Sequence, residues 1–390
     1  MTSATPDQAA FAKIDALRPE WVAMAHMRDL PGLDRRVLLH AGPPFASLGD
    51  IPQPVLNSFC IGCIREGWAA GPAQAMLLIQ SGAVAVEPAQ DHGILVPLAG
   101  VVGPSTAVLV VVDAGNPGRR FYSPLNEGMQ LCTRLGIVHA DLPAHLAWID
   151  SAVAGWIASR LGQPIALFDL VKAALAAGDD CHSRTMAGSA ALVSLLAGRE
   201  GAPDPDGRIR AFLDASPAFA LNVWMAMCGL LAGAAQGTIG SSLITRAGGN
   251  GVTFGFQTAG RPGVWMTLPA PAIQGRIDPA QGGRVATPAL GDSALVDFTG
   301  FGGQALDMAP VVRAAMEAVL PEDVASRPAA VLEGVLSGLG RRGATSLHRC
   351  STTGLGPVVL LGMIDAAGVA GRIGGGCVAI SGAALAKAAL

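Results

Sequence analysis

The chain has 390 residues, of which 51% are hydrophobic and only 14% are charged, so it can bury a sizeable core in two or three folding units and is neither a disordered segment nor a small disulfide scaffold. Its 26 basic and 29 acidic side chains give a net charge of −3 with no run of Lys or Arg, which argues against nucleic-acid binding. The seven cysteines are scattered, and charged residues stand where the apolar part of a signal peptide would lie. We therefore expect reduced thiols and a cytoplasmic location.

The first part of the chain alternates between strand and helix signals. Residues 37–39 predict a short buried strand that ends in the loop His40-Ala41-Gly42-Pro43-Pro44. Such loops at strand ends often carry functional groups. Beyond this loop we expect a helix over 66–80, strands over 83–86, 94–98 and 107–112, and a helix over 123–135 that starts at Ser123-Pro124 and stops at Gly136.

The middle of the chain changes to a succession of helical patterns. We expect helices over 146–161, 166–177, 185–196, 209–213 and 219–232. The stretch 216–245 has no charged residue and is long enough to cross a bilayer. Because Asn222, Gln236 and several glycines interrupt it, we expect a buried helix and no membrane partner.

The last third returns to mixed signals. We expect strands over 252–258, 264–268, 357–363 and 377–380, and helices over 304–319 and 331–339. The whole pattern predicts a mixed α/β (α+β) fold, with an N-terminal α/β domain over 1–140, a helical domain over 141–235 and a C-terminal α/β domain over 236–390.

The densest group of chemically useful side chains is Gly178-Asp179-Asp180-Cys181-His182-Ser183-Arg184. Helix capping explains part of it, with Gly178 as a C-cap and Asp180 or Ser183 as the N-cap of the next helix. Capping does not explain the whole set. His182 could act as a hydrogen-bond donor or general acid/base, and Arg184 could hold an oxyanion or phosphate in a bidentate fashion.

Three further segments are weaker candidates. Asn126-Glu127-Gly128 places Glu127 in the first turn of the expected helix, where the helix dipole alone favours a carboxylate. The glycine-rich turns expected over 246–251 and 372–376 could present backbone N–H groups to an anion, although neither matches a P-loop or a dinucleotide fingerprint. Gly291-Asp292-Ser293 forms a loop that turn chemistry also explains.

Metal and covalent chemistry have little support. Cys60 and Cys63 have the spacing of a zinc or redox pair. A tetrahedral zinc site needs two further ligands, and the nearest candidates, Cys181 and His182, have no recognisable zinc-finger spacing. No G-x-S-x-G elbow is present, and the cysteines lack a basic neighbour that would activate a thiolate. We expect no metal and no cofactor.

Several segments, read in order, resemble a known bacterial family. The sequence is similar to the AllG-like subunits of oxamate carbamoyltransferase over about residues 38–380. The segments that carry the resemblance are Leu39-His40-Ala41-Gly42-Pro43-Pro44, Arg65-Glu66-Gly67-Trp68-Ala69, Pro97-Leu98-Ala99-Gly100-Val101-Val102, Tyr122-Ser123-Pro124-Leu125-Asn126-Glu127-Gly128, Gly178-Asp179-Asp180-Cys181-His182-Ser183-Arg184, Gly240-Ser241-Ser242-Leu243-Ile244-Thr245, Asn250-Gly251-Val252-Thr253-Phe254-Gly255, Trp265-Met266-Thr267-Leu268-Pro269-Ala270 and Gly291-Asp292-Ser293-Ala294.

The resemblance implies a subunit that works with an FdrA-like partner related to succinyl-CoA synthetases, and often with a third subunit. In the family's pathway, oxalurate and phosphate give oxamate and carbamoyl phosphate. Such a transfer needs a polarised carbonyl, a held phosphate and aligned reactants, but no covalent nucleophile.

These requirements give the candidate residues their roles. Arg184 and the glycines at 248–251 would hold an anionic group, His182 would donate to the developing oxyanion or the leaving group, and Glu127 or Asp292 would orient the nitrogen. The substrate-binding candidates are His40, Asn126, Asp180, Ser242, Asn250, Gly251 and Ser293.

Two departures from the family pattern bear on the substrate. Ser183 stands where the family usually has Asn, and Gly362-Met363-Ile364-Asp365-Ala366 lacks the His-Lys pair that the family usually has. They imply a different carbamoyl acceptor or altered catalytic competence. The alternatives are a non-catalytic scaffold for the FdrA-like partner and a stand-alone hydrolase of ureides or cyclic amides, and the chain could also form a homo-oligomer.

Overall fold

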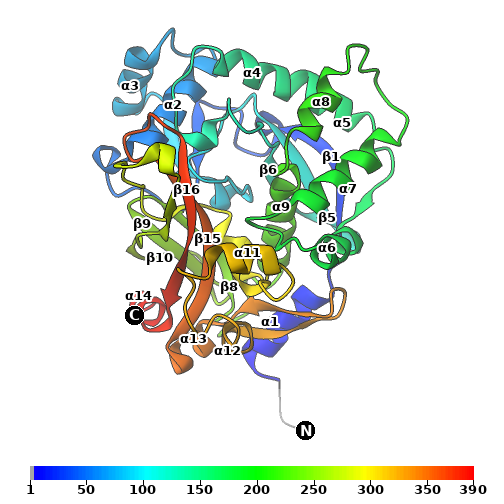
Figure 1. Cartoon of the computed structure of the whole chain (residues 1–390), viewed down its shortest axis with the longest axis vertical. Helices are drawn as coiled ribbons and strands as arrows, with labels where there is room; N and C mark the ends of the chain where they lie inside the picture. Colours follow the sequence, from blue (N-terminus) through cyan, green and yellow to red (C-terminus); the bar gives the residue numbers. More distant parts are fainter. Residues whose placement is uncertain (1–3) are drawn as a thin grey trace.

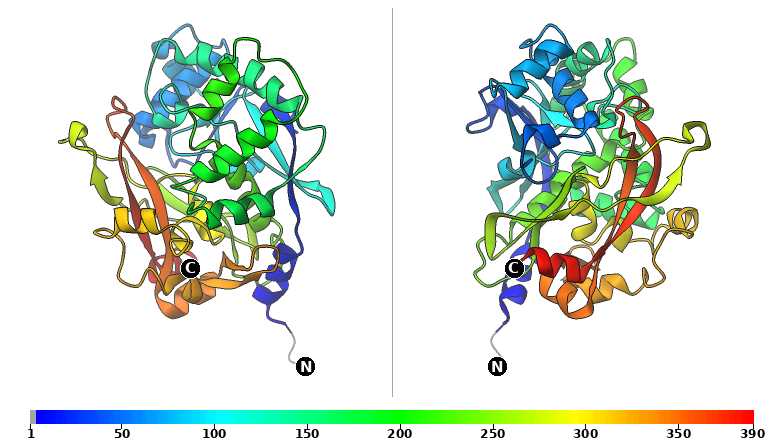
Figure 2. Two further views of the ribbon diagram at one scale, coloured as in Figure 1. Left: turned by 45° about the vertical axis from the view of Figure 1, so that its right-hand side comes forward. Right: turned by 90° about the vertical axis from the view of Figure 1, so that its left-hand side faces the viewer.

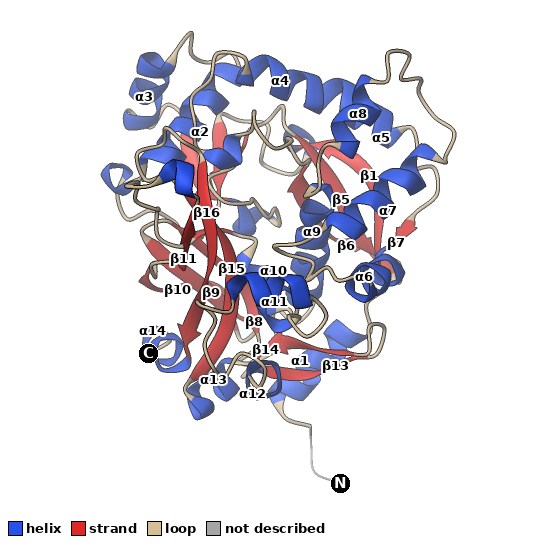
Figure 3. Cartoon of the chain, in the orientation of Figure 1, coloured by secondary structure: helices blue, strands red, loops and turns tan. Residues whose placement is uncertain are grey.

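The computed structural model describes residues 4–390 and shows a mixed α/β fold (Figures 1 and 3). The helices are α1 (Pro6–Asp15), α2 (Gln53–Arg65), α3 (Pro72–Gln80), α4 (Leu142–Trp148), α5 (Ala154–Ala158), α6 (Leu167–Ala176), α7 (Met186–Ala197), α8 (Arg208–Asp214), α9 (Phe219–Gly233), α10 (Ala294–Phe298), α11 (Pro310–Met316), α12 (Arg327–Val331), α13 (Leu347–Thr353) and α14 (Gly382–Ala388). A π-helical segment, Ile149–Val153, joins α4 to α5.

The strands form several small sheets. They are β1 (Pro19–His26), β2 (Val37–His40), β3 (Ala85–Pro88), β4 (Val101–Val102), β5 (Ala107–Asp113), β6 (Asn116–Pro124), β7 (Ile165–Ala166), β8 (Ile244–Asn250), β9 (Thr253–Thr258), β10 (Arg261–Pro269), β11 (Gln274–Ile277), β12 (Leu290–Gly291), β13 (Leu332–Leu336), β14 (Arg341–Thr345), β15 (Leu355–Ile364) and β16 (Arg372–Ser381). Their orders are β6-β5-β1-β7, β10-β9-β8-β12, β11-β16-β15, β3-β2-β4 and the hairpin β13-β14.

Strand β5 is buried on both faces, which explains its unbroken apolar run. Leu109 and Val111 point into the main core, whereas Val108 and Val110 point into a second core with β2. The alternation follows from the two-residue period of a strand. The sheet that contains β5 therefore lies between the helices and the β3-β2-β4 sheet.

Helix α9 is buried along almost its whole length and packs against β5, β6 and β8. Its surroundings account for the uncharged stretch of sequence, because a helix that is apolar all round needs a protein interior. Among residues 4–390, no single helix is long and apolar enough to span a membrane, although α8 and α9 pass that test together as a pair bent by 72°.

Figure 2 shows the long β15–β16 hairpin running beside the helical part of the chain. The hairpin pairs Val359 with Val378 and Leu361 with Gly376, and β11 joins the free edge of β16. Helix α1 packs against β13, where Phe11 fills the space that a side chain at position 334 would need.

The expected helices of the middle segment and the strands near 107–112, 253–258, 264–268, 357–363 and 377–380 are confirmed. The helix over 123–135 is wrong, because Ser123 and Pro124 end strand β6 and only the short turn Thr133–Leu135 is helical. Ser123 donates its hydroxyl to the carbonyl of Leu95, so it caps no helix.

Other boundaries also differ from the expectations. Residues 66–71 are not helical, and helix α2 was not expected. The strand expected over 94–98 is reduced to one β-bridge at Ile94, and the helix expected over 304–319 is reduced to α11. The helix over 331–339 is instead β13, which pairs with β14. The segments 246–251 and 372–376 lie mostly in β8 and β16, so most of their N–H groups face other strands and no open turn for an anion forms there.

Candidate functional site

The loop between α6 and α7 is built around the carboxylate of Asp180. That carboxylate accepts the backbone N–H of His182 at 2.6 Å and of Arg184 at 3.1 Å, and it also accepts the hydroxyl of Ser183. The expected capping role belongs to Asp179, which accepts the N–H of Gly188 in the first turn of α7 at 2.9 Å. Asp180 thus fixes the direction in which the His182 and Arg184 side chains leave the loop.

His182 forms a buried pair with Asp297 of α10. The imidazole Nδ1 lies 2.7 Å from Asp297 Oδ2, and the two side chains are 5% and 0% exposed. Asp297 Oδ1 accepts the backbone N–H groups of Gly303 at 2.7 Å and Leu360 at 3.2 Å. Burial by itself lowers the pKa of His182, but the charge of Asp297 and its hydrogen bond outweigh burial and raise that pKa above its usual value. The pair therefore favours the protonated form of His182.

His182 lines a cavity of about 440 Å³. In Figure 1 its walls come from elements around the centre of the molecule, with α7 on one side, β16 on the other and α11 below. Its polar side chains include Arg134, His182, Ser183, Arg184, Thr185, Ser293 and Arg372. Its lining includes no carboxylate among the described residues, so the cavity presents three guanidinium groups and one imidazole to a ligand. Such a surface suits a substrate with more than one negative charge.

Two of the arginines are held in place by main-chain contacts. Arg134 donates to the carbonyl of Gly128. Arg372 Nε donates to the carbonyl of Gly374 at 3.0 Å, and a Cβ atom at Gly375 would lie 3.0 Å from Arg372 Nη2. The glycines of β16 therefore leave the space in which this guanidinium lies.

Backbone strain concentrates at the same cavity. Leu98 and Cys181 have positive φ values of 47° and 66°, which residues with side chains rarely adopt. Leu98 lines the cavity, and Cys181 directly precedes His182. Strained backbone of this kind is often retained where function requires a fixed geometry.

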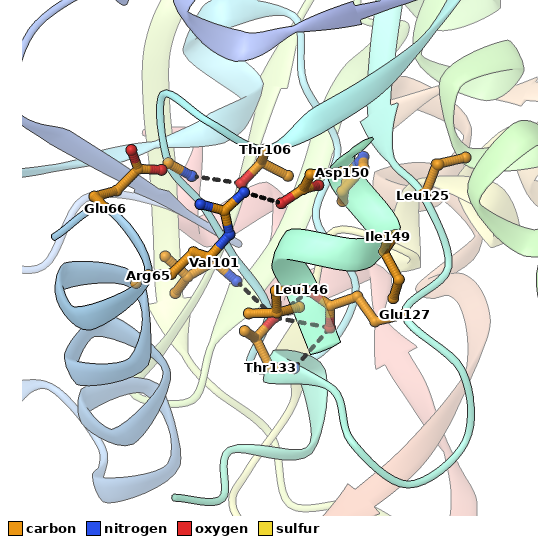
Figure 4. Close-up of a pocket in the computed structure, with 13 residues that line it drawn as sticks. Arg65, Glu66, Val101, Thr106, Leu125, Glu127, Thr133, Leu146, Ile149 and Asp150 are labelled. Carbon is orange, nitrogen blue, oxygen red and sulfur yellow. Dashed lines mark hydrogen bonds and ion pairs between the residues drawn. The ribbon is translucent and has the colours of Figure 1, made fainter. Parts of the chain in front are cut away.

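Glu127 does not line the His182 cavity but a separate small pocket (Figure 4). Its carboxylate accepts the backbone N–H of Thr133 at 2.6 Å and the Thr133 hydroxyl at 2.8 Å, next to the ion pair of Arg65 with Asp150 at 3.2 Å. The space among these side chains is about 20 Å³, which suits about one water molecule. Glu127 therefore holds the turn that carries Arg134.

Asp292 joins two loops below the cavity. It accepts the N–H of Gly42 at 2.8 Å and of Val96 at 2.9 Å, and burial raises its pKa to about 7. His40, the last residue of β2, is also buried. It donates Nδ1–H to the carbonyl of Ala41 at 2.8 Å, and burial lowers its pKa to about 4. Neither side chain lines the His182 cavity.

The remaining candidates divide between the cavity and other parts of the fold. Ser293 lines the cavity. Asn250 and Gly251 form the β8–β9 turn, where the Asn250 side chain also donates to the carbonyl of Pro43. Asn126 donates to the carbonyl of Ala218, and Ser242 bonds to Asp7 at the start of α1, far from His182 in the fold.

The cysteines are all free and buried. Burial raises the pKa of Cys63 to about 12, so it carries no thiolate near neutral pH. Within residues 4–390 no three His, Cys, Asp or Glu side chains gather in a way that could hold a metal ion.

Comparison with known proteins gives the family of the chain. The model of the family described as oxamate carbamoyltransferase subunit AllG matches residues 84–293, which is more than half of the chain. The chain belongs to this family. It is 28% identical to the oxamate carbamoyltransferase subunit AllG of Escherichia coli (strain K12), over 96% of the chain and 94% of that protein.

Two further proteins resemble this AllG family member. The uncharacterized protein YahG of Escherichia coli (strain K12) is 28% identical over 90% of the chain and 77% of its own length. A crystal structure of a conserved protein of unknown function from Enterococcus faecalis V583 superposes with a TM-score of 0.91 at 22% identity, covering 98% of this chain and 96% of that one. The similarity to the Enterococcus faecalis structure shows the fold.

Three residues at the His182 cavity or holding His182 were not candidates from the sequence. Asp297 lies in an apolar segment 115 positions after His182, and Arg372 opens a glycine run that resembled a turn. Arg134 lies in the segment 123–135 that was expected to be a helix. A signal existed for Asp297, since an acidic residue surrounded by Val and Phe must find a partner when buried.

Proposed function

We propose that this chain carries a carbamoyl-transfer site of an oxamate carbamoyltransferase-type complex, where a ureide such as oxalurate and phosphate give oxamate and carbamoyl phosphate. The observation that carries the proposal is the cavity in which His182, held by Asp297, faces the same space as Arg134, Arg184 and Arg372. Both substrates of this reaction are anions, and the cavity offers cationic groups for two of them. The family membership supports the reaction class.

The reaction balances without a covalent enzyme intermediate. A phosphate oxygen attacks the carbamoyl carbon, the bond from that carbon to the amide nitrogen breaks, and the nitrogen takes a proton as oxamate leaves. The guanidinium groups would hold the phosphate and the carboxylate and stabilise the negative charge that develops on the carbamoyl oxygen.

His182 would supply the proton to the leaving nitrogen. Asp297 favours the charged form of the imidazole, and because Nδ1 is engaged in the pair, Nε2 is the ring nitrogen left for a substrate. Ser183 and Ser293 would complete the polar contacts. The partners we propose are an FdrA-like subunit related to succinyl-CoA synthetases and a third subunit, with no cofactor required for the transfer itself.

The test is an assay of the assembled complex. The chain is co-expressed with its FdrA-like and third subunits, and phosphate-dependent formation of carbamoyl phosphate is measured from oxalurate and related ureides. His182→Asn and Arg184→Gln are each expected to lower turnover by about 100-fold or more, the range for loss of an acid or an oxyanion contact. His139→Asn and Arg28→Gln, at exposed positions outside the cavity, are the matched controls.

Three results would contradict the proposal. Unchanged turnover in the His182 and Arg184 variants would leave the chain as a scaffold. Release of ammonia by the isolated chain without phosphate would make it a hydrolase. Transfer that depends on residues of another subunit alone would place the site there.

A further inference from the structure

A second cavity of about 380 Å³ lies on the other side of α11 from the His182 cavity. Figure 3 shows α11, α12 and the β13–β14 hairpin grouped in the lower part of the molecule. Val311 and Val312 of α11 line the His182 cavity, whereas Arg313 lines the second one. Among the described residues, none lines both cavities.

The polar side of this cavity carries excess positive charge. Arg313, Arg341 and Arg342 line it, together with the single carboxylate of Asp307. Arg341 binds both oxygens of Asp307, at 2.9 and 2.7 Å, and this contact lowers the pKa of Asp307. One of the three positive charges is thus balanced. Arg313 and Arg342 have no carboxylate partner in the lining, although Arg342 Nη1 also donates to the carbonyl of Leu332 at 3.3 Å.

Two buried polar atoms belong to the same walls. Arg341 Nε and Gln304 Oε1 are buried and have no hydrogen-bond partner among the described residues. Gln304 is only 1% exposed, and its amide nitrogen is already engaged with the carbonyl of Val358 at 3.1 Å. Buried polar groups are nearly always paired, so unpaired ones next to a cavity indicate a missing water or ligand.

The opposite wall is apolar. It consists of Leu306, Val324, Ala325, Pro328, Ala329 and Val335. Val335 is 52% exposed. The volume lies within the range of small-molecule sites, about 300–1,000 Å³.

We propose that this cavity binds an organic phosphate monoester with a flat, apolar body of mononucleotide size. A phosphate monoester carries about −1.5 to −2 charges at pH 7, which matches two free guanidinium groups better than one carboxylate does. The apolar wall would cover the flat body of the ligand. The proposal does not depend on the proposed carbamoyl transfer.

One turn of the chain connects this cavity to the His182 site, so a ligand bound in the cavity would affect that site. Gly303 and Gln304 of the turn Gly302–Gln304 line the second cavity, and the N–H of Gly303 donates to Asp297 Oδ1 at 2.7 Å. A ligand that contacts this turn therefore acts on the carboxylate that holds His182.

The test is calorimetric binding of AMP to the full chain, with adenosine and inorganic phosphate as partial probes. AMP is expected to bind, and both partial probes are expected to bind more weakly. Arg313→Glu and Arg342→Glu are each expected to weaken AMP binding by about tenfold or more, the factor for loss of a charge-assisted contact. Arg28→Glu makes the same charge change at an exposed position outside both cavities and is expected to leave AMP binding unchanged.

The outcomes separate this inference from the proposed function. No AMP binding at millimolar concentration, or binding that Arg313→Glu and Arg342→Glu leave unchanged, would overturn the inference. AMP binding that disappears in Arg184→Gln would place the nucleotide in the His182 cavity and overturn it as well. None of these results bears on whether His182→Asn abolishes carbamoyl transfer.

Discussion

His182 is the residue on which most of the site geometry converges. Asp180 sets the loop through the N–H of His182, and Asp297 holds the ring. Asp297 is completely buried, so its charge acts on the imidazole without screening by water. The imidazole is therefore tuned by a residue that does not itself line the cavity.

Replacing Asp297 by Asn tests that tuning. The side-chain oxygen of Asn can still accept the N–H groups of Gly303 and Leu360, so the fold should persist. Burial would then lower the pKa of His182 without the opposing carboxylate. We expect turnover at pH 7 to fall by about tenfold or more and to recover as the pH is lowered, because the protonated imidazole is the active form.

The measurement for this variant is the pH profile of kcat in the assembled complex. Asp214→Asn removes a carboxylate from an exposed helix pair and serves as the control. A loss of turnover that is equal at all pH values would show that Asp297 contributes only to structure.

At the scale of elements, glycines decide whether strands can approach one another. Gly249 of β8 pairs with Gly291 of β12, and a Cβ atom at 249 would lie 2.1 Å from the carbonyl oxygen of Ala289. A Cβ atom added at Gly155 of α5 would have no other atom within 4 Å. The two glycines therefore respond to a methyl group in opposite ways.

We expect Gly249→Ala to lower the free energy of unfolding by about 2 kcal/mol or more through the forced displacement of β12. Gly155→Ala is expected to raise it by about 0.5–1 kcal/mol, because alanine is the better helix former. Urea unfolding of both variants beside the parent chain measures the difference. Equal effects of the two substitutions would refute the packing argument.

The sequence predicted the elements whose signal is local. Helix α9 and strand β5 are buried, long enough and uniformly apolar, so their patterns identify them. Strand β13 was predicted as a helix because Val331, Val335 and Leu339 also fit a helical spacing. Its pairing with β14 and its contact with Phe11 come from residues distant in sequence, which periodicity cannot show.

The same limit applies to the site. His182 and Arg184 stand in a dense polar loop and were identified from the sequence alone. Asp297, which holds His182, and Arg372, which lines the cavity, belong to elements that follow more than a hundred residues later, and their neighbours are ordinary strand and helix residues. Only the folded chain brings them together.

At the scale of the whole molecule, the cavity lies where distant portions of the chain meet. Its lining comes from the N-terminal segment at Leu98 and Arg134, the helical segment at His182, and the C-terminal segment at Ser293 and Arg372. No single portion of the chain could hold the site alone. Global stability and site geometry are therefore coupled.

Buried titratable groups give that stability a specific pH dependence. Burial raises the pKa of Asp150 and of Asp292 to about 7, against about 4 for a free carboxyl. A carboxyl of this kind contributes stability that is present below about pH 4 and is lost as the pH rises through about 7. Burial lowers the pKa of His40 to about 4, so His40 contributes in the opposite sense, with stability present above about pH 6.5 and lost as the pH falls through about 4.

Between about pH 4 and pH 6.5, the two carboxyls and the imidazole change the free energy of unfolding in opposite directions, and the two carboxyls have the larger combined effect. We therefore expect the free energy of unfolding to fall as the pH rises from about 5 to about 7, with a slope of up to about 1.4 kcal/mol per pH unit for each unbalanced group. Urea unfolding across this range measures the slope, and Asp292→Asn should flatten it because the amide does not titrate. A free energy of unfolding that rises toward pH 7, or a slope that Asp292→Asn leaves unchanged, would show that the buried Asp292 carboxyl does not govern the stability of the fold.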